Sequence, residues 1–251
     1  MEEKLYTIPL TEAFEADDEC ALCNVQRRIE NDLLDFVLGS ASSYMESDVR
    51  AMTDKEGFCK AHFKKMFDYG NTLGNGWILK THFEQINYEL KNQIKMFAPS
   101  KTSFMDRFKK KEADGENPIA RWARQRDKSC YICKRFDETY SRYLDTFFHM
   151  YKEGTLHNMI EKSKGFCIHH FGELCGMADI RLNDKQREEF YSLIFNVMKD
   201  AMERVSEDVS WLVEKFDYKN SDADWKNSKD AIQRGMQKLR GGYPANSPHK
   251  K

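Results

Sequence analysis

Eight cysteine and histidine side chains occur as four pairs, and two residues separate the members of each pair. The pairs are Cys20 with Cys23, Cys59 with His62, Cys130 with Cys133, and Cys167 with His170. Three thiolates and one imidazole make a tetrahedral ligand set that zinc favours, and residues three apart in a first helical turn project to the same side. Eight ligands at four per ion predict two Cys₃His sites and two Zn²⁺ ions per chain.

The pairs recur in the same order in two halves of the sequence. The CxxC segment Cys20–Cys23 matches Cys130–Cys133, and the segment Gly57–Phe63 matches Gly165–Phe171 in a Gly-Phe-Cys-x-x-His-Phe pattern. Such self-similarity is typical of duplication. We therefore predict one metal site within each half, so that each CxxC pair joins the CxxH pair that follows it. Crossed pairing, between CxxC of one half and CxxH of the other, stays open.

Other chemistry is compatible with these residues. A CxxC redox centre is usually found beside a βαβ pattern, which is absent here. A Cys₃His set also binds iron or an iron–sulfur cluster, and plain buried thiols are the simplest alternative. His170 is preferred to His169 as a ligand because it follows a cysteine by three and precedes Phe, as His62 does. Cys175 has no counterpart in the first half, so we expect a small buried residue.

The elements that must position these pairs are helical. Apolar residues recur at intervals of three and four over residues 79–97, 134–152 and 190–216, and the last stretch suits one helix of about eight turns or two helices end to end. The chain has only 13 Gly and 5 Pro, and no segment alternates with the period of a strand. The sequence therefore predicts an all-α fold of two pseudo-repeated helical halves, each a hairpin pinned by a metal site plus a long amphipathic helix.

A hairpin explains how distant pairs meet. In the second half we predict a helix outward to residue 152, a turn at Glu153-Gly154 and a return to Gly165. In the first half we predict the same path out to Leu38, around Gly39-Ser40 and back before Gly57.

Composition shifts suggest the domain boundaries. We expect a first repeat at 1–98, a polar linker at 99–118, a second repeat at 119–219, and a polar C-terminal segment at 220–251 that ends in a disordered tail. The glycine-rich stretch 70–76 is interpreted as a helix–helix connection rather than a phosphate-binding loop. No helix is predicted after Asp217.

Composition also excludes several classes of protein. The 251 residues include 40 basic and 41 acidic side chains, so a net charge of -1 gives no general attraction to nucleic acid. No apolar run is long enough to span a membrane, and 17 Phe, 11 Tyr and 4 Trp supply a core. The N-terminal residues lack a secretory pattern, so we expect a cytoplasmic protein with reduced thiols.

The predicted sites favour a role other than catalysis. A closed four-ligand site has no open position for substrate water, and the familiar catalytic motifs are absent. We expect a non-enzymatic binding or regulatory module with a protein or small-molecule partner. One alternative is a thiol-based redox or metal sensor that releases zinc on oxidation, and another is an enzyme with a cleft between the halves.

Three segments, Glu12–Cys23, Gly57–Phe63 and Asp224–Ala231, resemble an uncharacterised bacterial domain-of-unknown-function family with CxxC and GFCxxHF motifs. The resemblance extends over nearly the whole chain. It implies that CxxC and CxxH are defining elements of the family, and it implies no activity, substrate or catalytic residue.

Overall fold

The fold is all-α, as the apolar periodicity predicts. The computed structural model describes residues 2–40, 43–97 and 117–242, and within these ranges the chain forms helices and no strand. It divides into two compact units, one made of residues 1–29 and 138–251 and the other of residues 30–137. We call these unit 1 and unit 2.

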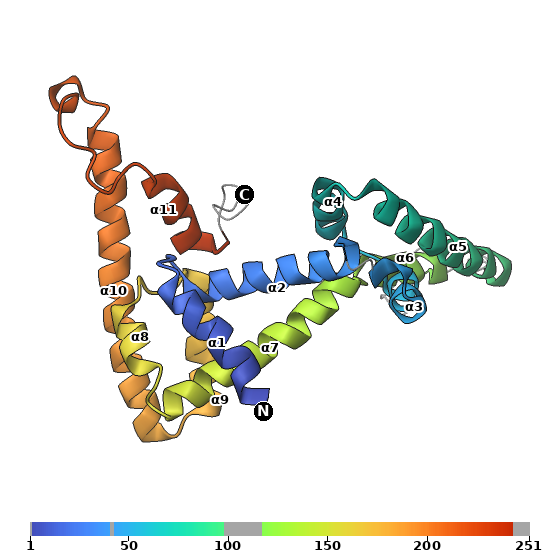
Figure 1. The fold of residues 1–251 in the computed structure, drawn as a ribbon, viewed down its shortest axis with the longest axis horizontal. Coiled ribbons are helices and arrows are strands. Elements are labelled where there is room, and N and C mark those ends of the chain that lie inside the picture. Colours follow the sequence, from blue (N-terminus) through green and yellow to red (C-terminus); the bar gives the residue numbers. More distant parts are fainter. Residues whose placement is uncertain (1, 41–42, 98–116, 243–251) are drawn as a thin grey trace, which may run out of the picture. The chain divides into compact units, whose positions relative to one another are not determined.

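Unit 1 contains the N-terminal helix and most helices of the C-terminal half (Figure 1). They are α1 (Glu2–Glu15), the first part of α2 (Ala21–Leu38), most of α7 (Tyr131–Lys152), α8 (His157–Lys162), α9 (Ile168–Arg181), α10 (Asp184–Glu214), the 3-10 helix η4 (Tyr218–Asn220) and α11 (Ala231–Arg240).

The core of unit 1 is aromatic. Phe147 on α7 lies in ring contact with Phe14, Phe166 and Phe190, with centroids 6.2–6.4 Å apart across this group. Aromatic pairs at such distances add to the free energy gained by burying their area. One ring on α7 thus joins α1, the segment before α9, and α10.

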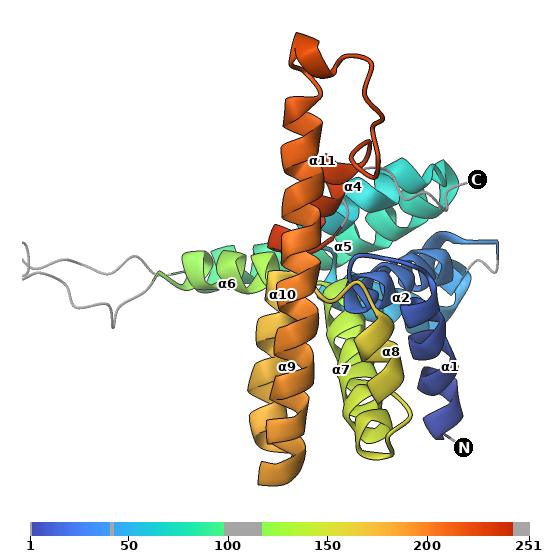
Figure 2. The same cartoon turned by 90° about the vertical axis from the view of Figure 1, so that its left-hand side faces the viewer.

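Helices α8, α9 and α11 pack along the long helix α10, and Figure 2 shows α9 beside its first half. Helix α9 runs antiparallel to its first half, since Phe171 contacts Phe195 and the Tyr191 hydroxyl donates to the Cys175 carbonyl. Helix α11 packs on its second half, where Gly235 lies against Val209. Helices α9 and α11 also contact each other.

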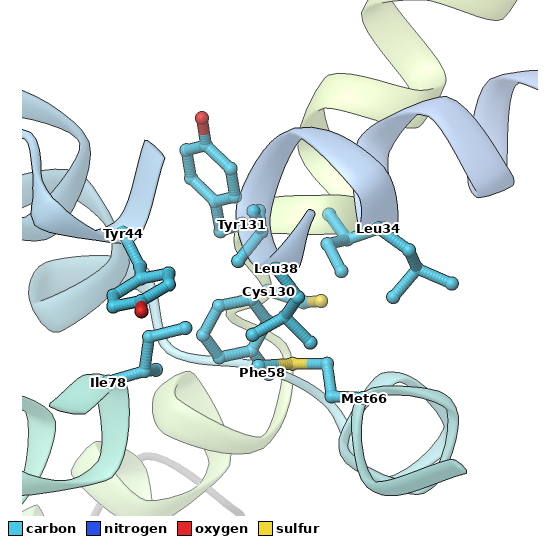
Figure 3. Packing of buried hydrophobic residues seen from close by; sticks show 10 residues of the cluster. Leu34, Leu38, Tyr44, Phe58, Met66, Ile78, Cys130 and Tyr131 are labelled. Carbon is cyan, nitrogen blue, oxygen red and sulfur yellow. The ribbon is translucent and has the colours of Figure 1, made fainter. Parts of the chain in front are cut away.

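Unit 2 is built from shorter helices around a compact apolar cluster. It contains the end of α2, the 3-10 helix η1 (Ser43–Met45), α3 (Ser47–Glu56), α4 (Lys60–Tyr69), α5 (Thr72–Met96), α6 (Pro118–Asp127) and the start of α7. Buried side chains from all but α3 and α6 meet in the core shown in Figure 3, among them Leu38, Tyr44, Phe58, Met66 and Ile78.

Several predicted elements are confirmed. Helix α7 covers the predicted stretch 134–152, α2 ends at Leu38, and Gly154 follows α7 with a positive φ of 79°. The long C-terminal stripe forms one helix of 31 residues, α10, instead of two.

Two local features differ from expectation. Only residues 70 and 71 of the stretch 70–76 connect two helices, because α5 begins at Thr72 and includes Gly74 and Gly76. The side chain of Asn71 caps this helix by accepting a hydrogen bond from Gly74 N–H. Helix α11 lies in the C-terminal segment where no helix was predicted.

The unit boundaries fall inside α2 and α7, so each unit draws residues from both sides of the predicted linker. Residues 99–116 of that linker and 243–251 of the predicted tail lie outside the described residues; Pro118 begins α6. Among the described helices, none has both the length and the apolar character needed to cross a bilayer.

Candidate metal centres

The unit 1 centre consists of Cys20, Cys23, Cys167 and His170. The Nδ1 atom of His170 lies 3.2 Å from Cys20 Sγ, 3.4 Å from Cys23 Sγ and 3.2 Å from Cys167 Sγ. The sulfur atoms of Cys23 and Cys167 are 3.8 Å apart. All four residues are buried, with exposures of 0–1%. Four ligand atoms therefore converge in the interior of unit 1.

The unit 2 centre repeats this geometry with Cys59, His62, Cys130 and Cys133. His62 Nδ1 lies 3.2 Å from Cys130 Sγ, 3.4 Å from Cys133 Sγ and 3.2 Å from Cys59 Sγ. The sulfur atoms of Cys59 and Cys133 are 3.8 Å apart. The four distances equal those of the unit 1 centre, and all eight predicted residues are thus gathered into two sets of four.

The pairing of these residues is the crossed one. Cys20 and Cys23 meet Cys167 and His170, whereas Cys59 and His62 meet Cys130 and Cys133. The prediction that each half closes its own site was wrong. The packing of α3 gives the reason: this helix contacts α5 and η1 within unit 2, so the chain after α2 builds unit 2 and forms no hairpin back to Cys23.

The spacing of the ligand atoms fits one tetrahedral ion. Zinc–sulfur bonds of about 2.3 Å place two sulfur atoms about 3.8 Å apart at the corners of a tetrahedron. That is the separation of Cys23 from Cys167 and of Cys59 from Cys133. A disulfide needs about 2.05 Å, so both pairs are free thiols here. In each set the ligand atoms all lie within 4.8 Å of one another.

Helix starts position every pair in the same way. Cys20, Cys59, Cys130 and Cys167 each stand directly before a helix, and their partners are its third residue. The sulfur then faces free N–H groups: Cys133 N–H donates to Cys130 Sγ, and His170 N–H donates to Cys167 Sγ, both at 3.4 Å. Such donors and the helix dipole stabilise thiolates.

The glycine of each GFCxxHF motif is required by the backbone. Gly57 and Gly165 have φ values of 64° and 81°, a region that favours glycine. At Gly57 the carbonyl accepts from Tyr131 N–H at 2.9 Å, which ties the segment before Cys59 to the start of α7 just after Cys130. This bond helps to bring the two ligand pairs of unit 2 together.

The protonation of these groups reflects their proximity. Burial alone would lower the pKa of His62, but hydrogen bonds with Cys130 and Glu30 outweigh it and raise the pKa to about 10. Burial would raise the pKa of Cys130, but the hydrogen bond from His62 lowers it to about 6. Burial and the neighbouring Cys130 raise the pKa of Cys133 to about 12. The proximity of Cys130 and Cys133 thus opposes ionisation of both thiols at once.

The unit 1 centre behaves similarly. Burial would lower the pKa of His170, but hydrogen bonds with Cys167 and Cys23 raise it to about 9. Hydrogen bonds from Cys20 and Cys23 hold the pKa of Cys167 well below its ordinary value, and burial raises that of Cys20.

Comparison with known proteins identifies the family. A family model described as a family of unknown function (DUF6062) matches residues 1–246. The chain belongs to this family. Neither the curated proteins nor the solved structures include a match. Membership of DUF6062 assigns no activity, substrate or ligand to the chain.

Glu30 contacts the unit 2 centre, and the spacing of the ligand pairs does not point to it. Nε2 of His62 donates to Glu30 Oε1 at 3.2 Å, and Lys65 pairs with the same carboxylate. A carboxylate at this position fixes the tautomer in which Nδ1 faces the thiolates and makes the imidazole a stronger ligand. In the unit 1 centre, Nε2 of His170 is buried and has no hydrogen-bond partner among the described protein atoms.

Helix α11 supplies further missed residues around the unit 1 centre. The Lys238 ammonium is buried, lies 3.2 Å from the Glu19 carboxylate, and donates to the backbone carbonyls of Glu19 and Lys164. Gln237 donates to Asp18 at 2.6 Å. Burial lowers the pKa of Lys238, against the opposing effect of Glu19. Helix α11 therefore joins the segments that precede Cys20 and Cys167.

His169 lies beside the unit 1 centre but outside its set of four, since its ring centroid is 5.1 Å from that of the ligand His170. His169 is exposed, and Cys175 is half-buried on α9. Arg27 and Lys134 form ion pairs with Asp18 and Glu56.

Proposed function

We propose that this protein is a zinc-binding, non-enzymatic binding or regulatory module in which two Cys₃His centres are structural. The observation that carries the proposal is the convergence of three sulfur atoms and one imidazole nitrogen, all within 4.8 Å of one another, in each of two sets. A cage of this size has room for one ion. Mixed thiolate and imidazole tetrahedra are typical of structural zinc, which favours zinc over iron.

Closed coordination supports a structural role. Four protein ligands fill the tetrahedron, so no position is left for a water or substrate that zinc would activate. Each ion would join segments 144 or 74 residues apart, which are the separations of Cys23 from Cys167 and Cys59 from Cys133. The centres then act as cross-links that hold helices in place for a protein or small-molecule partner in the cytoplasm.

Metal analysis of paired variants tests both the metal and the pairing. Untagged full-length protein should contain two zinc ions per chain, one for each set of four ligands. The variant Cys20→Ser/Cys167→Ser removes two ligands of one centre and should keep one zinc, as should Cys59→Ser/Cys133→Ser. The variant Cys20→Ser/Cys59→Ser damages both centres and should keep none. Iron in place of zinc, or an untreated protein without metal, contradicts the proposal.

A further inference from the structure

The two centres share their ligand geometry but differ in access to solvent. In unit 1 all four ligand residues are 0–1% exposed. In unit 2, Cys130 and His62 are buried, at 5% and 7%, while Cys59 and Cys133 are half-buried. Two of the three unit 2 cysteines are therefore partly exposed to solvent, whereas all three unit 1 cysteines are buried.

The C-terminal segment accounts for the protection of the unit 1 centre. A Cβ placed on Gly241, directly after α11, would lie 3.3 Å from Cys167 Sγ and 3.7 Å from Cys23 Sγ. The backbone thus passes over these sulfur atoms at contact distance. The buried Lys238, which bonds to the carbonyls of Glu19 and Lys164, holds this part of the chain down. Exposing the unit 1 thiols requires the displacement of α11.

In unit 2 the two accessible thiols are also neighbours. Cys59 Sγ and Cys133 Sγ lie 3.8 Å apart, so a shift of about 1.8 Å would bring them to disulfide distance. Cys59 lies directly before α4, and Cys133 lies in the first turn of α7. Rotation about the Cα–Cβ bond of each side chain can move its sulfur atom. Cys175 is also half-buried, but it belongs to neither set of four.

We propose that the unit 2 centre is a site of reversible thiol oxidation, at which a hydroperoxide converts Cys59 and Cys133 into a disulfide, while the unit 1 centre stays reduced. The two thiolates give up two electrons and a bond forms between their sulfur atoms. The O–O bond of the hydroperoxide breaks, and its oxygen atoms leave as water and an alcohol, or as two waters for hydrogen peroxide, after uptake of two protons. Oxidation removes two of the four unit 2 ligands, and a dithiol reductant reverses the step.

The predicted loss of one metal ion on oxidation rests on the proposed function, in which each centre holds zinc. The test uses zinc-loaded full-length protein treated with hydrogen peroxide, followed by alkylation of free thiols, digestion and mass spectrometry. Metal in solution is followed with a chromophoric chelator. We expect a peptide pair linked through Cys59 and Cys133, loss of one of the two zinc ions per chain, and recovery of both after dithiothreitol and zinc are added.

Two controls separate the outcomes. The Cys175→Ser variant keeps both sets of four residues and should behave like the unaltered protein. Metal content before peroxide treatment tests the proposed function alone, because an untreated protein without zinc contradicts that proposal whatever its thiols do. Oxidation of Cys20, Cys23 or Cys167 as fast as Cys59, or persistence of free Cys59 and Cys133 under peroxide, overturns the oxidation site.

Discussion

At the scale of single residues, corresponding positions in the two CxxC helices have different roles. Glu30 follows Cys23 by seven residues on α2, and Tyr140 follows Cys133 by seven on α7. Glu30 accepts from the imidazole of His62 in unit 2. In unit 1 the Tyr140 ring centroid is 6.0 Å from that of His170, and its hydroxyl donates to Glu173 at 2.7 Å. Only the unit 2 imidazole is therefore oriented by a carboxylate in the described structure.

The variant Glu30→Gln should weaken metal binding at the unit 2 centre by about 10- to 100-fold, because the carboxylate that orients and polarises the His62 imidazole is lost. Competition with a chromophoric chelator measures the affinities of both centres. The unit 1 centre should be unchanged. Glu89→Gln is a matched control in unit 2, since Glu89 bonds to Trp122 and not to a ligand residue. Equal affinity in Glu30→Gln and the unaltered protein would show that the bond is incidental.

The eight clustered residues could be predicted because their types and their spacing both carry information. Glu30 could not, because it is one of 41 acidic residues and no spacing rule distinguishes it. Its only signal was position: it occupies the place in α2 that Tyr140 occupies in α7. Because the corresponding residue in α7 is Tyr140, the comparison of the two helices does not predict that Glu30 binds a histidine.

At the scale of elements, helices with an apolar stripe were predictable, and α11 was not. Helix α11 buries Arg234, Gln237 and Lys238, and their partners include the acidic residues Glu19 and Asp18. A buried polar face looks like a solvent-facing one in the sequence, since only the partners distinguish them. The sequence of α11 therefore predicts a polar segment, although the helix packs beside the unit 1 centre.

The glycine of the GFCxxHF motif gives an element-scale prediction. Gly57 has φ 64° and ψ -158°, and a Cβ there would lie 2.7 Å from the His82 ring. That ring is anchored, because its Nδ1 atom bonds to the Asp54 carbonyl at 2.8 Å. Backbone strain and the clash should make Gly57→Ala less stable by about 2 to 5 kcal/mol. Urea unfolding of the zinc-loaded protein, followed by circular dichroism, measures the change.

Gly76→Ala is the matched control for Gly57→Ala. Gly76 lies in unit 2 inside α5, and a Cβ there meets no heavy atom within 4 Å. Alanine favours a helix interior, so this variant should gain about 0.5 to 1 kcal/mol. A Gly57→Ala protein as stable as the control would remove the argument that the motif glycine positions Cys59.

At the scale of the whole molecule, the sequence could not decide how the four pairs combine. Within-half and crossed pairing use the same eight residues at the same local spacing. The choice depends on where the helix that follows each CxxC helix packs. In the second half, α8 follows α7 and packs on α10, so it does not form the predicted hairpin arm along α7. Such tertiary contacts decide the crossed pairing, and the local spacing of the ligands does not encode them.

Crossed pairing makes the proposed ions long-range cross-links, and this leads to a prediction for metal removal. A permanent link that closes a loop of 144 or 74 residues reduces the conformational entropy of the unfolded chain. In the chain-entropy treatment, each such link stabilises the folded state by about 4 to 5 kcal/mol. Structural zinc binding contributes about 10 to 16 kcal/mol at neutral pH, which matches or exceeds the stability of most domains. A strong chelator should therefore unfold the protein.

The half-buried thiols of unit 2 set the expected order of events. The first zinc should leave the unit 2 centre with partial loss of helical signal, and the second should leave the sealed unit 1 centre with the rest. Circular dichroism at 222 nm and zinc release are recorded together as chelator is added. In the Cys59→Ser/Cys133→Ser variant only the second step should remain. If both ions leave while helicity and Tm stay unchanged, the centres do not hold the fold together.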